Sequence, residues 1–560
     1  MPDFNEDRAK EVLRRATSLE QERDSNFKSS WQTLANYYLP QLSNIDTEKT
    51  EGLTGWSDEI YDTTGPWAGR ICATGHRNWC TPSTEPWFMW APPANIRDED
   101  EAAGWCARCT EIALAELARS TFYMRVLEVY YSRCYFGTGI LMGEQGKQTT
   151  LNFRQRKIGT YAIAENDEGL VDTTYHRFKL SSRAAAQMFG LENLGHKVAK
   201  AAEDGKKLDT KFEFIHEIRP REEVERDRRR KDGANMPISS VYVGVEDKVC
   251  VKTSGFWEMP DFVTRFDSWG TDTPWGYSPA FLALPDVREI NYVKRFTHAQ
   301  AELRANPRIL TPANLQGMVD MRPGGETTFD PNNPNALPRE WLTTADLKDT
   351  QLMIESIKKD ISQAFYADIF TMLQQIDRRM TAYEIAQRVG EKLEQFSPSF
   401  DRLISELTTP LLRCVFGILY RAGKFPQAPA SMFQATANGK TVALAMPEVT
   451  YTSRLALALK AMQNKATLDT MQFAAELANT TQRPEILDPF KLPQMMARYA
   501  LSQGMPASDI RTPKEQLAVA EARAKQMQQV QALENMKTGS EAAKNMGKAP
   551  AAMQEQMGAA

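Results

Sequence analysis

Cysteine and histidine are the residue types in this chain best suited to bind a metal or to act as nucleophile and base. The chain has 560 residues, seven of them cysteines and five of them histidines. Cys106 and Cys109 have the spacing of half a zinc site, but tetrahedral zinc needs four ligands and no second cysteine pair follows. The histidines are widely spaced, and none has a partner at a metal or triad spacing. We therefore predict neither a metal site nor a cofactor site.

A glycine-rich turn and the acidic residues are the other possible marks of catalysis. Gly137, Gly139 and Gly143 resemble part of a nucleotide-binding turn. That fingerprint needs a strand before it and a helix after it, whereas this sequence predicts the reverse order. The chain contains no Gly-x-x-x-x-Gly-Lys-Ser/Thr loop, and no pair of carboxylates stands in an apolar segment that would shift its pKa. The sequence therefore does not predict an enzyme.

The composition is that of an ordinary folded protein. Hydrophobic residues make up 42% and charged residues 25%, and the formal net charge is −4, so any contact with nucleic acid is expected at local patches. No apolar run reaches the roughly 18 residues of a membrane-spanning helix, and the N-terminus lacks the apolar core of a signal peptide. The odd, scattered cysteines favour reduced thiols and folding in the cytoplasm.

The first half of the chain mixes helices with short strands. Helical spacing of apolar residues predicts helices over 5–39, 65–81 and 101–136, and Gly137 is expected to end the third. Segments rich in β-forming residues predict strands over 151–153, 160–164, 211–218, 240–245, 248–253 and 261–267. The mixed-charge run 219–231 is interpreted as a solvated loop. The fold class expected is α+β, predominantly helical.

Two long amphipathic helices enclose a compact insert in the middle of the chain. Ser278 is placed to cap the first helix, with Pro279 at its first helical position. At about 1.5 Å per residue this helix should be roughly 30–40 Å long. The insert is rich in proline, glycine and asparagine, and a second amphipathic helix follows it. Together the three segments predict a helical hairpin that carries a small head.

The C-terminal part is mostly helical. A long helix is predicted over 381–425, with breaks or kinks at Pro398 and Pro410 and an end at Gly423. The last third is rich in alanine, glutamine and methionine, and one further helix is predicted from Pro513. The final residues offer little to bury, so they are interpreted as a frayed tail.

Short motifs stand in a characteristic order along the chain. They are Tyr61-Asp-Thr-Thr-Gly-Pro66, Trp87-Phe88, Phe136-Gly-Thr-Gly139, Tyr277-Ser-Pro279, Leu284-Pro-Asp286, Met380-Thr-Ala382-x-Glu384 and Arg421-Ala-Gly423. This order resembles that of head-to-tail connector proteins, the portals of T7-like and related short-tailed phages. The resemblance runs from about residue 5 to 430 and fades beyond it. The run 219–231 matches no feature of the family.

The resemblance implies a phage portal fold that assembles into a dodecameric ring at one capsid vertex. The family's parts are a wing, a two-helix stem, a clip, a channel loop and a helical crown. On this chain they would correspond to 1–277 (wing), 278–306 (stem helix 1), 307–343 (clip), 344–370 (stem helix 2), 371–380 (channel loop), 381–425 (long wing helix), 426–512 (crown) and 513–560 (C-terminal crown or barrel helix and flexible tail).

A portal must let double-stranded DNA slide without gripping it, and a channel of mixed charge would allow this. We hypothesise that the polar faces of the two stem helices line the bore. The basic candidates are Lys294, Arg295, Arg304, Lys348, Lys358 and Lys359, and the acidic counterweights are Glu302, Glu355 and Asp360. Individual residues among them could instead form inter-subunit ion pairs or face solvent. Arg378 and Arg379 are the candidates for the channel loop, the alternative being a solvated turn.

The resemblance also implies partners and a location. The terminase large subunit and then the tail adaptor would dock on the clip, and the major capsid, scaffolding and internal core proteins are further expected partners. The protein would reside at the head–tail junction of the virion and in the host cytoplasm during assembly, without a membrane. Two alternatives stay open: another ring-forming virion component, such as a tail adaptor or internal core protein, and a DNA-processing enzyme.

Overall fold

The computed structural model describes residues 2–42, 45, 60–96, 100–205, 207–222, 227, 230, 232–268, 273–305, 308–311, 319–320, 326, 339–341, 347–374, 396–435, 442–453, 456–457, 470, 472–477, 480–481, 483, 490, 495–496, 515–516, 519 and 521–530. The chain divides into two compact units. The first comprises Met1–Trp90, Arg108–Pro426 and Val449–Ala466, and the second comprises Ala91–Ala107, Gln427–Glu448 and Thr467–Ala560.

The largest sheet of the first unit has five antiparallel strands in the order β4-β5-β6-β7-β8. Its strands are β4 (Tyr161–Glu165), β5 (Val171–Ser181), β6 (Lys211–Pro220), β7 (Ile238–Gly244) and β8 (Val249–Phe256). Successive side chains of a strand point to opposite faces, so Phe214 and Ile215 of β6 belong to different cores. Each face of this sheet therefore needs its own cover.

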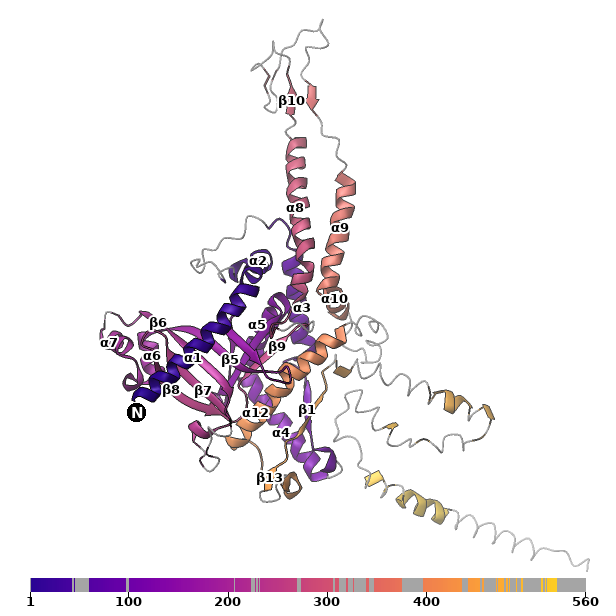
Figure 1. Ribbon diagram of the computed structural model, residues 1–560. Coiled ribbons are helices and arrows are strands. Elements are labelled where there is room, and N and C mark those ends of the chain that lie inside the picture. The colour runs from indigo at the N-terminus through magenta and orange to yellow at the C-terminus, as the bar shows by residue number, and fades with distance from the viewer. Residues whose placement is uncertain are drawn as a thin grey trace, which may run out of the picture. The chain divides into compact units, whose positions relative to one another are not determined.

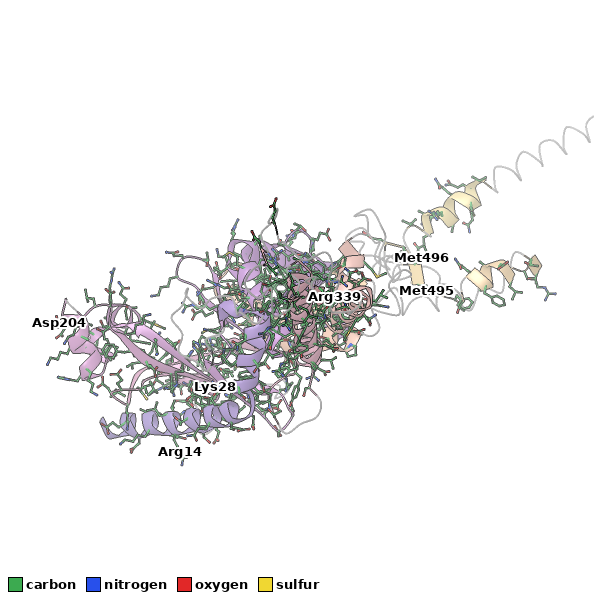
Figure 2. All side chains as sticks on the ribbon, turned by 90° about the horizontal axis from the view of Figure 1, so that it is seen from above. Arg14, Lys28, Asp204, Arg339, Met495 and Met496 are labelled. Carbon is green, nitrogen blue, oxygen red and sulfur yellow. The ribbon has the colours of Figure 1, made fainter. Side chains whose placement is uncertain are left out.

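Helices cover both faces of the five-stranded sheet (Figure 1). The N-terminal helix α1 (Pro2–Arg23) packs Val12 on the face that carries Ile215. Helices α6 (Ser182–Phe189) and α7 (His196–Glu203) pack Phe189 on the face that carries Phe214. Figure 2 shows Arg14 of α1 on the side of the helix that points away from the sheet.

The second part of the first unit is a helical layer on a three-stranded sheet. The strands, in the order β3-β2-β9, are β2 (Thr138–Gln145), β3 (Leu151–Arg156) and β9 (Asp261–Arg265). The helices include a π-helical turn (Asp24–Lys28), α2 (Ser29–Tyr38), α3 (Thr64–Cys80), α4 (Asp100–Arg119, its first turns in the second unit), α5 (Phe122–Phe136) and the helix Phe396–Arg421, which contains a π-turn (Ile404–Thr408) followed by α12 (Thr409–Arg421). A separate two-stranded sheet is formed by β1 (Phe88–Ala91) and β14 (Glu448–Tyr451).

A helical hairpin projects from this layer (Figure 1). It consists of α8 (Pro279–Ala305) and, antiparallel to it, α9 (Leu347–Ala364), which continues as α10 (Ala367–Gln374). Strands β10 (Arg308–Leu310) and β11 (Arg339–Trp341) pair beyond the outer ends of the two long helices. The lower part of the hairpin is packed on the body, because Ile290 and Ile361 are fully buried.

The second unit contains one described strand pair, β12 (Phe433–Ala435) with β13 (Val442–Leu444). Met432 beside it is fully buried, and its carbonyl accepts a hydrogen bond from the N–H of Ala445. In the C-terminal third, residues 521–530 are helical and exposed, within the helix predicted from Pro513.

Most predicted elements are present, with differences at their ends. The helix predicted over 101–136 is two helices, α4 and α5, separated at Ser120 and Thr121. The helix predicted over 344–370 is broken at Tyr366, which has a positive φ of 54°. The hydroxyl of Ser278 does not cap α8 as predicted but donates to the carbonyl of Tyr135 at 2.8 Å. Strand β5 was not predicted.

The described residues form a predominantly helical α+β fold, as expected, and contain no closed barrel. One helix, Phe396–Arg421, is long and apolar enough to cross a bilayer by length and composition alone. It is largely buried in the first unit, as expected of a core helix.

Candidate functional site

The middle of α8 is attached to the body by polar contacts with the segment before α3. The side-chain oxygen of Asn291 accepts hydrogen bonds from the backbone N–H groups of Tyr61, at 2.6 Å, and Asp62, at 2.8 Å. The ammonium of Lys294, one turn further along α8, lies 2.5 Å from the carboxylate of Asp62. The other carboxylate oxygen accepts the backbone N–H of Thr64 at 2.7 Å. These contacts fix the helix about halfway along its length.

The Asp62 carboxylate is 2% exposed, so its negative charge depends on these partners. Burial raises the pKa of Asp62, but hydrogen bonds from Lys294 and Thr64 outweigh burial and hold that pKa below its usual value. Lys294 was a candidate for contact with DNA. The structure instead places its charge in an ion pair within the chain, so Lys294 differs from the other basic candidates.

The remaining stem candidates lie further from the body or on the outer surface. Arg295, Arg304 and Lys359 are exposed, and Lys358 is half-buried. The acidic counterweights Glu302, Glu355 and Asp360 are all exposed on the same two helices. Lys348 belongs to α9, but its side chain lies outside the described residues, as do Arg378 and Arg379 entirely. The exposed surface of the hairpin thus carries both signs of charge.

The same hairpin carries large apolar side chains that water reaches. Ile357 and Ile361 are buried, whereas Leu352 of the same helix is 66% exposed. On α8, Tyr292 and Phe296 are exposed, with ring centroids 4.5 Å apart. Phe296 belongs to the apolar stripe that helical spacing predicts for this helix, and it is exposed in the single chain. Both long helices therefore present a second, uncovered apolar surface in the single chain.

The closest approach to a metal site among the described residues is a buried cluster of Cys72, His76 and Cys134. Its geometry opposes metal binding. Nδ1 of His76 lies 2.7 Å from the carbonyl oxygen of Cys72 and must therefore carry a proton. Nε2 lies 2.8 Å from a guanidinium nitrogen of Arg133, which can only donate. Because both ring nitrogens are engaged, neither offers a lone pair to a cation.

Arg133 is fully buried and connects distant segments. Its guanidinium donates to the carbonyl oxygens of Arg265, at 3.1 Å, and Ser399, at 2.7 Å, and lies 4.7 Å from the ring centroid of Phe266. The rings of Phe370 and Phe396 pack on His76 beside it, with centroids 5.6 Å and 5.2 Å from the imidazole. Through Phe370 and Phe396, these contacts connect α10 with the start of the helix Phe396–Arg421.

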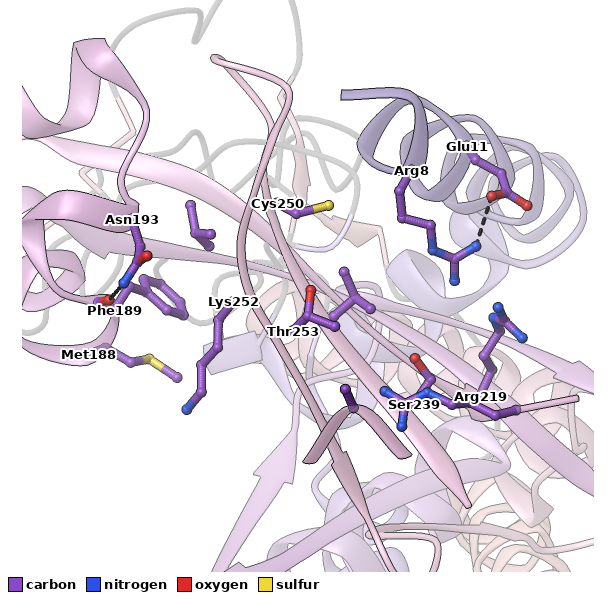
Figure 3. A pocket seen from close by; sticks show the side chains of 14 residues that line it. Arg8, Glu11, Met188, Phe189, Asn193, Arg219, Ser239, Cys250, Lys252 and Thr253 are labelled. Carbon is purple, nitrogen blue, oxygen red and sulfur yellow. Dashed lines mark hydrogen bonds and ion pairs between the residues drawn. The ribbon is translucent and has the colours of Figure 1, made fainter. Parts of the chain in front are cut away.

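A groove of about 1180 Å³ lies between α1 and α6, across the edge strand β8 (Figure 3). Figure 3 shows Arg8 and Glu11 on one side of that strand and Met188 on the other, with Lys252 between them. Arg8 pairs with Glu11 and with the buried Glu217, both at 2.8 Å. The carboxylate of Glu11, which lines the groove, is therefore engaged by arginine.

Part of the buried cluster could be predicted from spacing in the sequence. Cys72 and His76 are four residues apart in a predicted helix and therefore share one face. Cys134 and Arg133 come from a separate helix, and no spacing rule connects the two helices. His76 is a buried core histidine, and its hydrogen-bond partner Arg133 could not be found from spacing in the sequence.

Comparison with known proteins gives consistent matches. The family model described as "Bacteriophage head to tail connecting protein" matches residues 9–511. The chain is 28% identical to the portal protein of Salmonella phage epsilon15 over 544 residues, 96% of this chain and 94% of the relative. It is also 28% identical to the probable portal protein of Bordetella phage BPP-1 over 545 residues, 96% of this chain and 95% of the relative.

Proposed function

Because this chain belongs to the family of bacteriophage head-to-tail connecting proteins and serves at the portal vertex of the virion, we propose that twelve copies of it surround a passage for double-stranded DNA. DNA would enter through this passage during packaging and leave through it during ejection. The family is one of structural proteins rather than enzymes. In this chain the stem hairpin would form the wall of the passage.

The observation that carries the proposal is the uncovered apolar surface of that hairpin. Leu352 and Phe296 sit on helices that already bury another side against the body. An apolar surface on a rod that projects from a folded unit marks an interaction site. Neighbouring copies arranged around an axis would cover it, and the interface would be the same at every step of the ring.

The charges of the hairpin suit DNA that slides. Duplex DNA carries about one negative charge per 1.7 Å of its axis, so a purely basic wall would hold it tightly. The basic candidates Arg295, Arg304 and Lys359 stand beside exposed acidic residues on the same helices. A bore lined by both signs of charge would attract the duplex without arresting it. Lys348 and Lys358 remain proposed lining residues, while Lys294 would contribute less because Asp62 binds it.

The segment 371–380 supplies the proposed channel loop, with Arg378 and Arg379 as its DNA contacts. The terminase large subunit and then the tail adaptor would dock on the insert 307–343. Capsid, scaffolding and internal core proteins would meet the remaining surfaces, and assembly would take place in the host cytoplasm. Membership of the family and the position of the segments along the chain support these proposed roles.

The proposal is tested in two steps: ring assembly of the purified protein, and then DNA packaging by two double variants. Purified protein should give flanged rings with a central hole by negative-stain electron microscopy, and monodisperse small particles would contradict the ring. Arg378→Glu/Arg379→Glu should assemble normally but reduce DNA packaged or retained per particle. Arg228→Glu/Arg229→Glu makes the same charge change in the run 219–231 and should leave packaging unchanged. Normal packaging by the first variant would remove the loop assignment.

A further inference from the structure

Two buried thiols face each other in the core of the first unit. The sulfur of Cys72 in α3 and the sulfur of Cys134 in α5 lie 3.3 Å apart and share a hydrogen bond. Both residues are fully buried, and both are free thiols. A disulfide bond has a sulfur–sulfur length of about 2.05 Å, so the two atoms would have to close by about 1.2 Å.

Helices α3 and α5, which carry the two cysteines, pack directly on each other. Gly69 lies one turn before Cys72 in α3, and a Cβ added there would come within 2.2 Å of the ring of Tyr135, the neighbour of Cys134. Only the absence of a side chain at Gly69 allows this approach. A disulfide needs Cα atoms within about 7 Å of each other, so two directly packed helices are an arrangement in which it can form.

The surroundings favour negative charge on one sulfur. Arg133 is fully buried beside the pair, and its hydrogen-bond acceptors are two carbonyl groups, a hydroxyl and an imidazole. Burial raises the pKa of the Cys72 thiol. At Cys134, burial is outweighed by the hydrogen bond to Cys72, by His76 and by the nearby guanidinium of Arg133, so the pKa of Cys134 is lowered. A thiolate is the reactive form of cysteine.

We propose that Cys72 and Cys134 form a modification site that a peroxide oxidises to an intramolecular disulfide. The Cys134 sulfur attacks one peroxide oxygen, the O–O bond breaks, and the product is a sulfenic acid and one water. The Cys72 sulfur then attacks the sulfenic sulfur, the S–O bond breaks, and a second water leaves with the Cys72 proton. In balance, two thiols and one hydrogen peroxide give one disulfide and two waters.

Hydrogen peroxide is small and uncharged, so local opening of the core is sufficient for it to reach Cys134. The bond would link α3 to α5 beside His76, where Phe370 and Phe396 pack. It would therefore join the helices that hold the end of the second stem helix. The inference concerns the body of the subunit and stands independently of DNA passage.

The experiment uses the full-length protein in its assembled form. The protein is treated with hydrogen peroxide, unfolded in an alkylating reagent, digested without reduction and mapped by mass spectrometry. The expected product is a linked peptide pair that contains Cys72 and Cys134 and disappears on reduction. The oxidised protein should also unfold at a higher temperature than the same sample after reduction.

Two alanine variants provide the control. Cys72→Ala should abolish the linked pair and leave oxidation of Cys134 to the sulfenic or sulfinic acid, whereas Cys80→Ala, which removes another buried thiol of α3, should retain the link. The proposal is overturned if both Cys72 and Cys134 of the unsubstituted protein are recovered alkylated after peroxide treatment, or if oxidation is confined to the partly exposed Cys250. Mapping of the unsubstituted protein decides the matter even where a variant folds poorly.

Discussion

Lys294 and Arg295 are neighbours on α8 with the same charge and different surroundings. Lys294 is paired at 2.5 Å with Asp62, a carboxylate that is almost completely buried, whereas Arg295 is exposed. Removing one partner from a pair whose other member is buried leaves a charge without compensation. Lys294 therefore attaches the helix to the body, whereas Arg295 is available for contact with its surroundings.

We expect Lys294→Met to lower the free energy of unfolding by about 1–3 kcal/mol, since Asp62 would lose its cation while remaining buried. Arg295→Met should change it by less than about 0.5 kcal/mol. Chemical denaturation of the two variants measures both values. Equal effects would mean that the ion pair contributes little. Because the pKa of Asp62 is lowered in the fold, its contribution is present above about pH 4 and is lost as the pH falls through the folded pKa.

His216 predicts a second pH dependence, in a different range. Burial first, and the charge of Arg156 second, hold the pKa of this histidine well below 6.5. The unfolded chain therefore binds a proton that the folded chain does not, and stability falls as the pH drops below about 6.5, by at most about 1.4 kcal/mol per pH unit for this group. His216→Gln should reduce the slope between pH 7 and pH 5, and substitution of the exposed His196 should not. An unchanged slope would rule out His216 as the source.

Helical spacing predicted that Lys294 and Arg295 lie on an amphipathic helix but could not separate their roles. The partner of Lys294 lies far away in the sequence, and no periodicity connects α8 with Asp62. The same limit applies to Arg133 and His76, which come from different helices. Residue types and their faces could be predicted, but their partners depend on how the elements pack.

At the scale of elements, the predicted boundaries depend on residues with special backbone conformations. Gly137 ends α5 as predicted, with φ 86°. The break at Tyr366 between α9 and α10 was not predicted, because tyrosine rarely adopts a positive φ and tertiary packing imposes it here. Strand β5 was missed since its sequence is polar: it lies inside the sheet, but several of its side chains are only half-buried.

Gly137→Ala should destabilise the protein strongly, because the added Cβ would strain the left-handed backbone and lie 2.1 Å from the carbonyl oxygen of Gly276. Gly169→Ala is the matched control. Gly169 has φ 74° but open space around it, so only the backbone cost of about 1 kcal/mol is expected. Thermal unfolding should separate the two variants clearly. Similar losses in both would show that the contact with Gly276 relaxes freely.

At the scale of the whole molecule, the sequence pattern predicted a helical hairpin with a head, and the described residues contain the hairpin. The pattern predicted apolar stripes on both helices but did not show that each helix carries two apolar surfaces. Of the stripe predicted on α8, Ile290 is buried and Phe296 is exposed, because spacing assigns residues to a stripe but does not encode the direction of the body. In the proposed ring, neighbouring copies would cover the exposed apolar surface of the two helices.

Leu352→Asp should reduce ring formation while leaving the fold of the single chain intact, because Leu352 is exposed in the chain and would meet a neighbour in the ring. Ser356→Asp adds the same charge at an exposed position of the same helix, and it should form more rings than Leu352→Asp does. Light scattering coupled to size-exclusion chromatography measures the assembly, and circular dichroism checks the fold. Assembly of the Leu352 variant equal to that of the control would exclude this surface from the interface.

The attachment of α8 at Asn291 has a mechanical consequence. The part of the helix from Asn291 to its end at Ala305 is about 20 Å long at 1.5 Å per residue. A tilt of about 10° around that pivot moves the far end by roughly 3.5 Å, about the diameter of a carbon atom. The helix thus acts as a lever arm: a small rotation at Asn291 displaces its end at Ala305 by about one atomic diameter.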